Sequence, residues 1–154
     1  MATKAEALTE LQQAYERFRG KTAGLPAEAW DDVWLGTWSL GELLAHMSGW
    51  WREMTPAFAR VARGERPVPE GVDYSNPDPF NVRFAASAPR GKEALEAWDM
   101  AFAAYVEAAR SLGDDFYGEN EQGRPKIGNR LLQGAGIGHF EEHEPELDHW
   151  LAGR

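Results

Sequence analysis

The chain has 154 residues, of which 43% are hydrophobic, including seven tryptophans and seven phenylalanines; we therefore expect a single domain with one buried core over residues 1–154. Its net charge of −9 argues against nucleic acid, membranes and strongly anionic substrates as partners, although local fields can reverse the global sign. The absence of cysteine excludes disulfides, thiolate metal sites and a thiol nucleophile within the chain.

The N-terminal segment predicts an amphipathic helix. Leu8, Leu11, Tyr15 and Phe18 recur at intervals of three and four residues, and the pattern ends near Gly20. This segment lacks the apolar stretch of a signal peptide, and a run of about 18 apolar residues occurs nowhere in the chain. We therefore expect a cytoplasmic protein without a membrane span.

A second, longer helix is predicted after a short helix over residues 25–34. Ser39 and Glu42 have the spacing of a capping box, and an apolar stripe with steps of three and four begins directly after Ser39. The pattern continues to Gly64, and Pro56 predicts a kink within it.

The remaining elements complete an all-α prediction. Residues 64–79 contain four prolines and two glycines without periodicity, which indicates a long connection that either crosses the domain or carries function. Helical patterns follow over residues 92–112, with a turn or two added by residues 78–88, and over residues 127–151. No strand-like alternation of useful length is present. We predict a four-helix bundle with a long connection between its second and third helices.

Three of the four histidines lie in the segment HFEEHEPELDHW, residues 139–150. His139 and His143 are four residues apart, so they share one face of the predicted helix with Leu132 and Ala135. Such a pair forms half of a metal site in many proteins. The alternative is that the two imidazoles are only hydrogen-bonded within the core.

Four further residues bear on the interpretation of this pair. His46 lies beside the apolar stripe of the second helix, where it either joins the pair in a cleft or hydrogen-bonds at a helix seam. His149 is more than about 90° around the helix from the pair, so we expect it to be exposed. Pro145 predicts a kink just after the pair. Glu142 belongs either to a solvated acidic face or to the site, as a hydrogen-bond partner or base.

The order of these motifs resembles a known superfamily. TKAEALTELQQAYERF, WSLGELLAHMSGW, the proline-containing connection and GHFEEHEPELDHWL together resemble the DinB/YfiT-like superfamily of metal-dependent hydrolases over nearly the whole chain. The resemblance implies a four-helix bundle, often a homodimer, with a divalent metal held by one histidine of the second helix and a His-x-x-x-His pair of the last. Carried onto this sequence, the ligands are His46, His139 and His143, and the metal is zinc or nickel.

The implied function is a metal-dependent enzyme that acts on a small molecule, by hydrolysis or by transfer of a low-molecular-weight thiol. Because the chain has no cysteine, that thiol would come from outside the protein. Trp50, Tyr74, Asn76 and Asn81 either line the substrate pocket or serve only packing and loop capping. Sequence alone indicates no general base.

WSLGELLAHMSGW, DPFNVRFAASA and DDFYGE also resemble the ClbS/DfsB-like branch, which includes a resistance protein that opens a reactive cyclopropane. This branch tends to lack the three histidines, so the resemblance as a whole favours the metal-binding branch. Two alternatives stay open: a non-catalytic bundle that binds a small molecule or a metal, and metal-independent protection against a reactive genotoxin.

Overall fold

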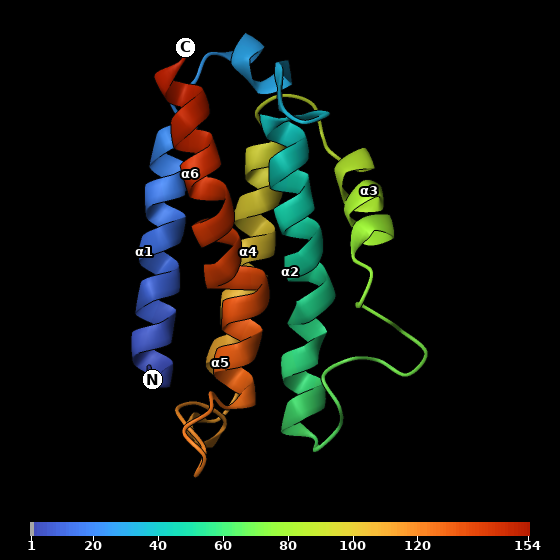
Figure 1. Ribbon diagram of the computed structural model, residues 1–154, viewed down its shortest axis with the longest axis vertical. Coiled ribbons are helices and arrows are strands. Elements are labelled where there is room, and N and C mark those ends of the chain that lie inside the picture. The colour runs from blue at the N-terminus through green and yellow to red at the C-terminus, as the bar shows by residue number, and fades with distance from the viewer. Residues whose placement is uncertain (1) are drawn as a thin grey trace.

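The computed structural model describes residues 2–154, and most of them are helical (Figure 1). No helix in this range is both long and apolar enough to cross a membrane. The elements in chain order are α1 (Lys4–Thr22), the 3₁₀ helix η1 (Ala27–Asp31), β1 (Val33–Leu35), β2 (Trp38–Ser39), α2 (Leu40–Ala62), α3 (Asp78–Ala86), α4 (Glu93–Ser111), the 3₁₀ helix η2 (Asp114–Phe116), α5 (Ile127–Leu132), the π-helix η3 (Gln133–Ile137) and α6 (Gly138–Ala152).

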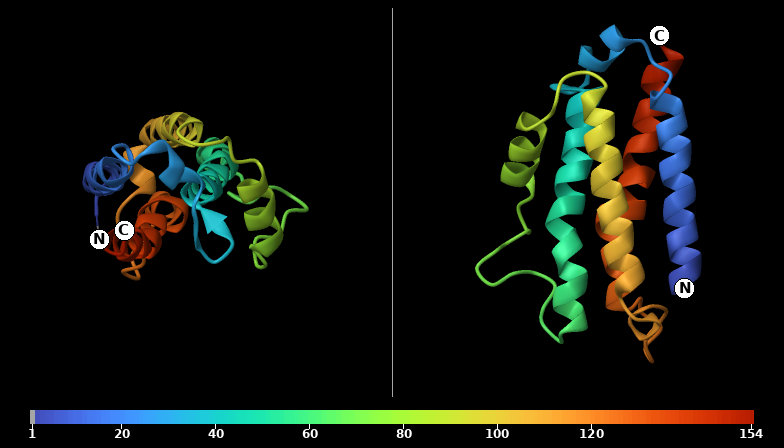
Figure 2. Two further views of the ribbon diagram at one scale, coloured as in Figure 1. Left: turned by 90° about the horizontal axis from the view of Figure 1, so that it is seen from above. Right: turned by 180° about the vertical axis from the view of Figure 1, so that it is seen from behind.

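The long helices lie side by side along the long axis of the molecule. α1 and the final run of α5, η3 and α6 point in one direction, and α2 and α4 point in the other (Figure 1). Because α2 and α4 start from the same end, the chain between them has to return along the length of the molecule. It does so through residues 63–77 and α3, which lie on the outside of α2 (Figure 2).

Two local predictions need correction. The short helix expected over residues 25–34 is the 3₁₀ helix η1, and it is followed by an antiparallel pairing of β1 with β2 where no strand was predicted. The two strands span three and two residues, which is too short for alternation to be recognised. Gly36 closes the turn between them with φ of 61°, a left-handed conformation that glycine adopts without strain.

Residues 78–86 form the separate helix α3 and not an extension of α4. Pro89 lies between the two helices and disfavours helical geometry at the residue before it. α3 packs closely on α2, since a Cβ atom built on Gly49 would lie 2.1 Å from Cγ of Phe84. The contact requires glycine at position 49, and it places α3 beside the segment of α2 that contains His46.

α2 begins as predicted. The Ser39 hydroxyl accepts a hydrogen bond from the Glu42 amide at 3.3 Å, and the Glu42 carboxylate accepts one from the Ser39 amide at 3.2 Å, which confirms the capping box. The helix continues past Pro56 to Ala62. Its apolar stripe is buried in the centre of the core, where the ring of Trp51 packs against aromatic rings of α4 and α6.

Candidate metal centre

The first histidine of the site comes from α2. His46 is only 5% exposed, because it lies within residues 43–49 of α2, all of which are buried. The indole ring of Trp38, in β2, lies 4.8 Å from the imidazole between ring centroids. The unpredicted hairpin therefore supplies one wall of the site.

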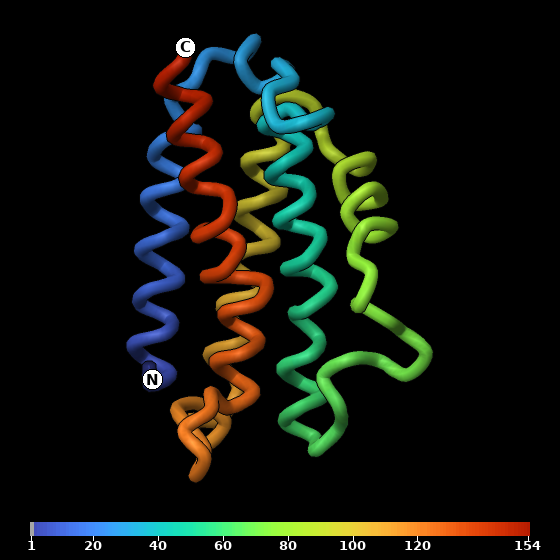
Figure 3. Tube along the Cα trace, viewed as in Figure 1, coloured from blue at the N-terminus to red at the C-terminus, as the bar shows by residue number. Residues whose placement is uncertain are grey.

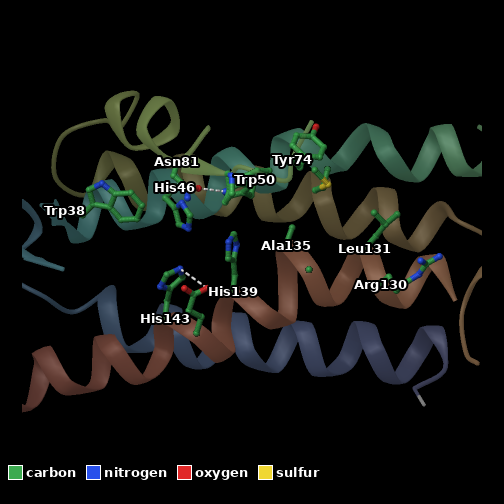
Figure 4. Close-up of a pocket in the computed structure, with 14 residues that line it drawn as sticks. Trp38, His46, Trp50, Tyr74, Asn81, Arg130, Leu131, Ala135, His139 and His143 are labelled. Carbon is green, nitrogen blue, oxygen red and sulfur yellow. Dashed lines mark hydrogen bonds and ion pairs between the residues drawn. The ribbon is translucent and has the colours of Figure 1, made fainter. Parts of the chain in front are cut away.

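The other two histidines come from the first two turns of α6. The ring centroids of His139 and His143 are 5.6 Å apart, and they lie 5.0 Å and 5.3 Å from the centroid of His46. One nitrogen from each of the three rings lies within 4.8 Å of the other two (Figure 4). The structure thus brings together the three residues that the sequence nominated, and it leaves His149 exposed, as predicted.

The three rings fit a metal ion by a criterion that is independent of their spacing. Nδ1 of His46, Nδ1 of His139 and Nε2 of His143 are each shielded from solvent and have no hydrogen-bond partner. A buried polar atom without a partner costs free energy, and nearly all such atoms in folded proteins are satisfied. A divalent cation is a partner that three imidazoles can share.

Two carboxylates adjoin the third ring. The Glu146 carboxylate lies 3.3 Å from Nδ1 of His143, where it can accept a hydrogen bond from that ring nitrogen. Glu142 lies on the other side, with Oε2 3.9 Å from Nε2 of His143 and a side chain that is 66% exposed. Two interpretations of Glu142 were compatible with the sequence, and in the structure this residue lines the cleft beside the histidines. Glu146 was not predicted, although its spacing of three from His143 is the signal that could have identified it.

Burial keeps two of the imidazoles neutral. It lowers the pKa of His46 to about 4, with a further contribution from the neighbouring His143, and it lowers the pKa of His139 to about 3, with contributions from the two other rings. Metal ligation requires neutral imidazole. At neutral pH these two rings therefore offer lone pairs and not protons.

These pKa values predict that the metal-free protein loses stability as the pH falls from about 6.5 toward 4. In this window the unfolded chain protonates imidazoles that the folded chain keeps neutral, so acid favours unfolding. At about pH 5 the loss is roughly 2 kcal/mol for each of His46 and His139. Urea unfolding at about pH 7 and about pH 5 measures it. The variant His139→Gln should show a smaller pH dependence and His149→Gln an unchanged one; equal dependence in all three proteins would contradict buried, neutral imidazoles.

The histidines lie at one end of a cleft of about 610 Å³. Trp50, Tyr74 and Asn81 line it, as the sequence suggested, but Asn76 does not: its side chain accepts a hydrogen bond from the Asp78 amide. The full lining is Trp38, His46, Trp50, Met54, Tyr74, Pro77, Asn81, Arg130, Leu131, Gly134, Ala135, His139, Glu142 and His143.

Two hydrogen bonds fix the outer wall of the cleft. The Trp50 indole donates to the Asn81 side chain of α3 at 2.7 Å, and the Tyr74 hydroxyl donates to the Glu53 carboxylate at 2.5 Å. The first bond links α2 to α3, and the second links α2 to the long connection. The connection therefore contributes a residue to the site, which is one of the two roles that its length suggested.

A π-helical turn aligns the last helix with the site. The Gly138 amide donates to the carbonyl of Gln133, five residues earlier, and the chain passes from α5 into α6 without a loop (Figure 3). Such a turn contains about one extra residue, so later residues lie about 100° behind their places in an uninterrupted α-helix. For this reason Leu132, expected on the histidine face, is fully buried in the core, and Leu131 lines the cleft instead. α6 is helical from Gly138 to Ala152, so the helix continues through Pro145.

Comparisons with known proteins agree on the fold. Residues 10–144 match the DinB superfamily. No curated protein sequence matches the chain. An uncharacterised protein from Escherichia coli UTI89 is 17% identical with a TM-score of 0.80, over 99% of this chain and 95% of that one. The sibling lethal factor precursor DfsB is 14% identical with a TM-score of 0.79, over 99% and 97%. A mycothiol-dependent maleylpyruvate isomerase is 16% identical with a TM-score of 0.69, over 96% of this chain and 63% of that one. At these identities the likeness concerns the fold alone.

Proposed function

The chain belongs to the DinB superfamily, and from this premise we propose that it is a metal-dependent enzyme built on a four-helix bundle. It acts on a small molecule by hydrolysis or by transfer of a low-molecular-weight thiol. His46, His139 and His143 hold the ion, which is zinc or nickel. The observation that carries the proposal is the set of three buried imidazole nitrogens, each without a hydrogen-bond partner, at the end of an open cleft.

The chemistry of the donor set supports a catalytic site over a closed structural one. Three imidazoles leave at least one coordination position for water or substrate, and a structural site usually has four protein ligands. When bound, the ion supplies Lewis acidity toward water, a thiol or a substrate oxygen. The cleft gives small molecules access to that position, and the indole of Trp50 in α2 forms part of its wall.

The chain's own residues provide the remaining functions. Glu146 holds the His143 ring through Nδ1. Glu142 reaches the same end of the cleft from α6 and is the carboxylate best placed to accept a proton from a reacting water or thiol. Trp50, fixed by its hydrogen bond to Asn81, lines the cleft and provides an apolar contact for a substrate.

The proposed function is tested with zinc-loaded, nickel-loaded and metal-free protein in screens of ester and amide hydrolysis and of thiol conjugation. We expect turnover only in a loaded form, loss of turnover on chelation and its return on adding the metal. Turnover that survives in His46→Ala would instead support metal-independent protection against a reactive compound. Tight metal binding without turnover in either screen would support a binding protein.

Glu142→Gln should lower kcat about a hundredfold or more while the metal content stays near that of the wild type, because the variant loses a proton acceptor and no ligand. Steady-state kinetics and elemental analysis of the same samples measure the two effects. Glu141→Gln is the matched control, since Glu141 is the preceding residue of α6, is exposed and does not line the cleft. Loss of the metal in Glu142→Gln would make Glu142 a ligand and would contradict its role as a base.

A further inference from the structure

The end of the cleft away from the histidines carries a positive charge. Of the residues that line the cleft within residues 2–154, Arg130 alone has a permanent positive charge. Its guanidinium makes no ion pair and no side-chain hydrogen bond with any described residue. Arg130 is therefore available to bind a group outside the protein.

The local charge around Arg130 opposes the net charge of the chain. Arg124 and Lys126 line an adjoining pocket together with Arg130, next to Asp115. The Lys126 ammonium donates to the backbone carbonyl of Asp115 at 3.1 Å. A chain with a net charge of −9 thus gathers three cations at this one end of α5. Local charges of this kind attract anions whatever the global sign.

The two ends of the cleft have opposite character. Arg130 precedes His139 by nine residues, so the helical rise separates their backbones by roughly 13 Å. Figure 4 places Arg130 and Leu131 at one end and the three histidines at the other. Glu142 lies at the histidine end. Arg130 attracts a carboxylate at the opposite end, so an elongated molecule that is held at the histidine end by another group is oriented with its carboxylate toward Arg130.

The walls between the two ends are mainly apolar. The side chains of Trp50, Met54 and Leu131 line this part of the cleft, and Gly134 and Ala135 leave room opposite them. Apolar walls favour a hydrocarbon segment over a hydrated one. The cleft therefore accommodates a chain of several carbon atoms between its two ends.

We propose that the cleft selects small molecules with a carboxylate at the end opposite the reacting group, and that Arg130 binds this carboxylate. A single guanidinium has one charge and a planar set of donors that matches a carboxylate. Arg130 is then a specificity residue for the substrate or for its thiol partner. The inference rests on the proposed function, because the other end of the ligand is held at the metal.

The test uses zinc-loaded protein and ω-mercaptocarboxylates of increasing length: mercaptopropionate, mercaptohexanoate and mercaptooctanoate. The matched probes are mercaptoalkanols of the same lengths, which offer the same thiol to the metal and lack the charge. Isothermal titration calorimetry gives each Kd. The variants are Arg130→Gln and Arg52→Gln, which remove the same charge; Arg52 is exposed on α2 and does not line the cleft.

We expect the wild type and Arg52→Gln to bind a longer carboxylate about tenfold more tightly than its alcohol, a preference of the size that a charge-assisted hydrogen bond gives. The preference should be small for mercaptopropionate and should fall to about twofold or less for every length in Arg130→Gln. Thiol binding without a carboxylate preference, or a preference that persists in Arg130→Gln, would overturn this inference and leave the proposed function standing. Failure of the wild type to take up zinc would overturn both.

Discussion

Replacing either His46 or His139 with alanine lowers the affinity of the protein for zinc by more than about a hundredfold, since loss of a hydrogen-bond partner behind a ligand already costs about tenfold to a hundredfold. His46 comes from α2 and His139 from α6, so either variant leaves two donors and opens the site to water. After dialysis against metal-free buffer, elemental analysis should find about one zinc ion per wild-type chain and almost none per variant chain. Competition with a chromophoric chelator gives the two affinities.

His149→Ala is the control for this prediction. It removes the same side chain from the same helix, but His149 is exposed and does not line the cleft. The control should retain wild-type zinc content and affinity. Circular dichroism establishes that all variants are folded, which we expect because His46→Ala and His139→Ala each remove a ring whose Nδ1 has no partner in the metal-free protein, and His149 is exposed. Equal zinc content in His46→Ala and His149→Ala would refute the assignment of His46 as a ligand.

The second large effect is expected at Gly138. A Cβ atom at this position would lie 2.5 Å from the carbonyl oxygen of Gln133, the acceptor of the π-type hydrogen bond. Alanine therefore forces the π turn to rearrange. Because the turn sets the rotation of α6 relative to α5, the change displaces His139 and His143 together relative to His46. We expect Gly138→Ala to lower zinc affinity by about tenfold or more, in the range found when the support of a ligand is lost.

Gly134→Ala is the matched substitution. It adds the same methyl group within the same π-helical segment, where no atom lies within 4 Å of the new Cβ. Its zinc affinity should equal that of the wild type, and its stability should rise by up to about 1 kcal/mol from the better helix propensity of alanine. Chelator competition and urea unfolding of both variants separate the two effects. If Gly138→Ala binds zinc as tightly as Gly134→Ala, the π turn does not position the histidines.

Long amphipathic helices were predictable because their signal is repeated over many turns. Spacing within a single helix predicts each of three features: the apolar stripe of α2, the start of α2 at Ser39, and the pairing of His139 with His143 on α6. Short or irregular elements were not predictable in this way. The β1–β2 hairpin is too short for a periodic signal, and the π turn leaves no apolar pattern that separates it from an α-helix.

The candidate site was predictable only in part for a related reason. Convergence of His46 with the C-terminal pair is a tertiary relationship, and the resemblance to a superfamily supplied it where spacing could not. Arg130 and Trp38 were missed because each reaches the cleft through an element that the sequence did not define: the register shift at η3 in one case, and the hairpin in the other. Glu142 was left with two interpretations because exposure on a helix face does not reveal a neighbouring cleft.

The most direct test of the central claim is X-ray absorption spectroscopy at the zinc edge of the loaded wild-type protein. Binding by His46, His139 and His143 predicts about three imidazole nitrogens at about 2.0–2.1 Å, together with an oxygen donor from solvent. The outer-shell scattering of imidazole identifies the rings. A spectrum with fewer than two imidazoles, or one dominated by carboxylate oxygens, would show that zinc binds elsewhere and would contradict a three-histidine centre.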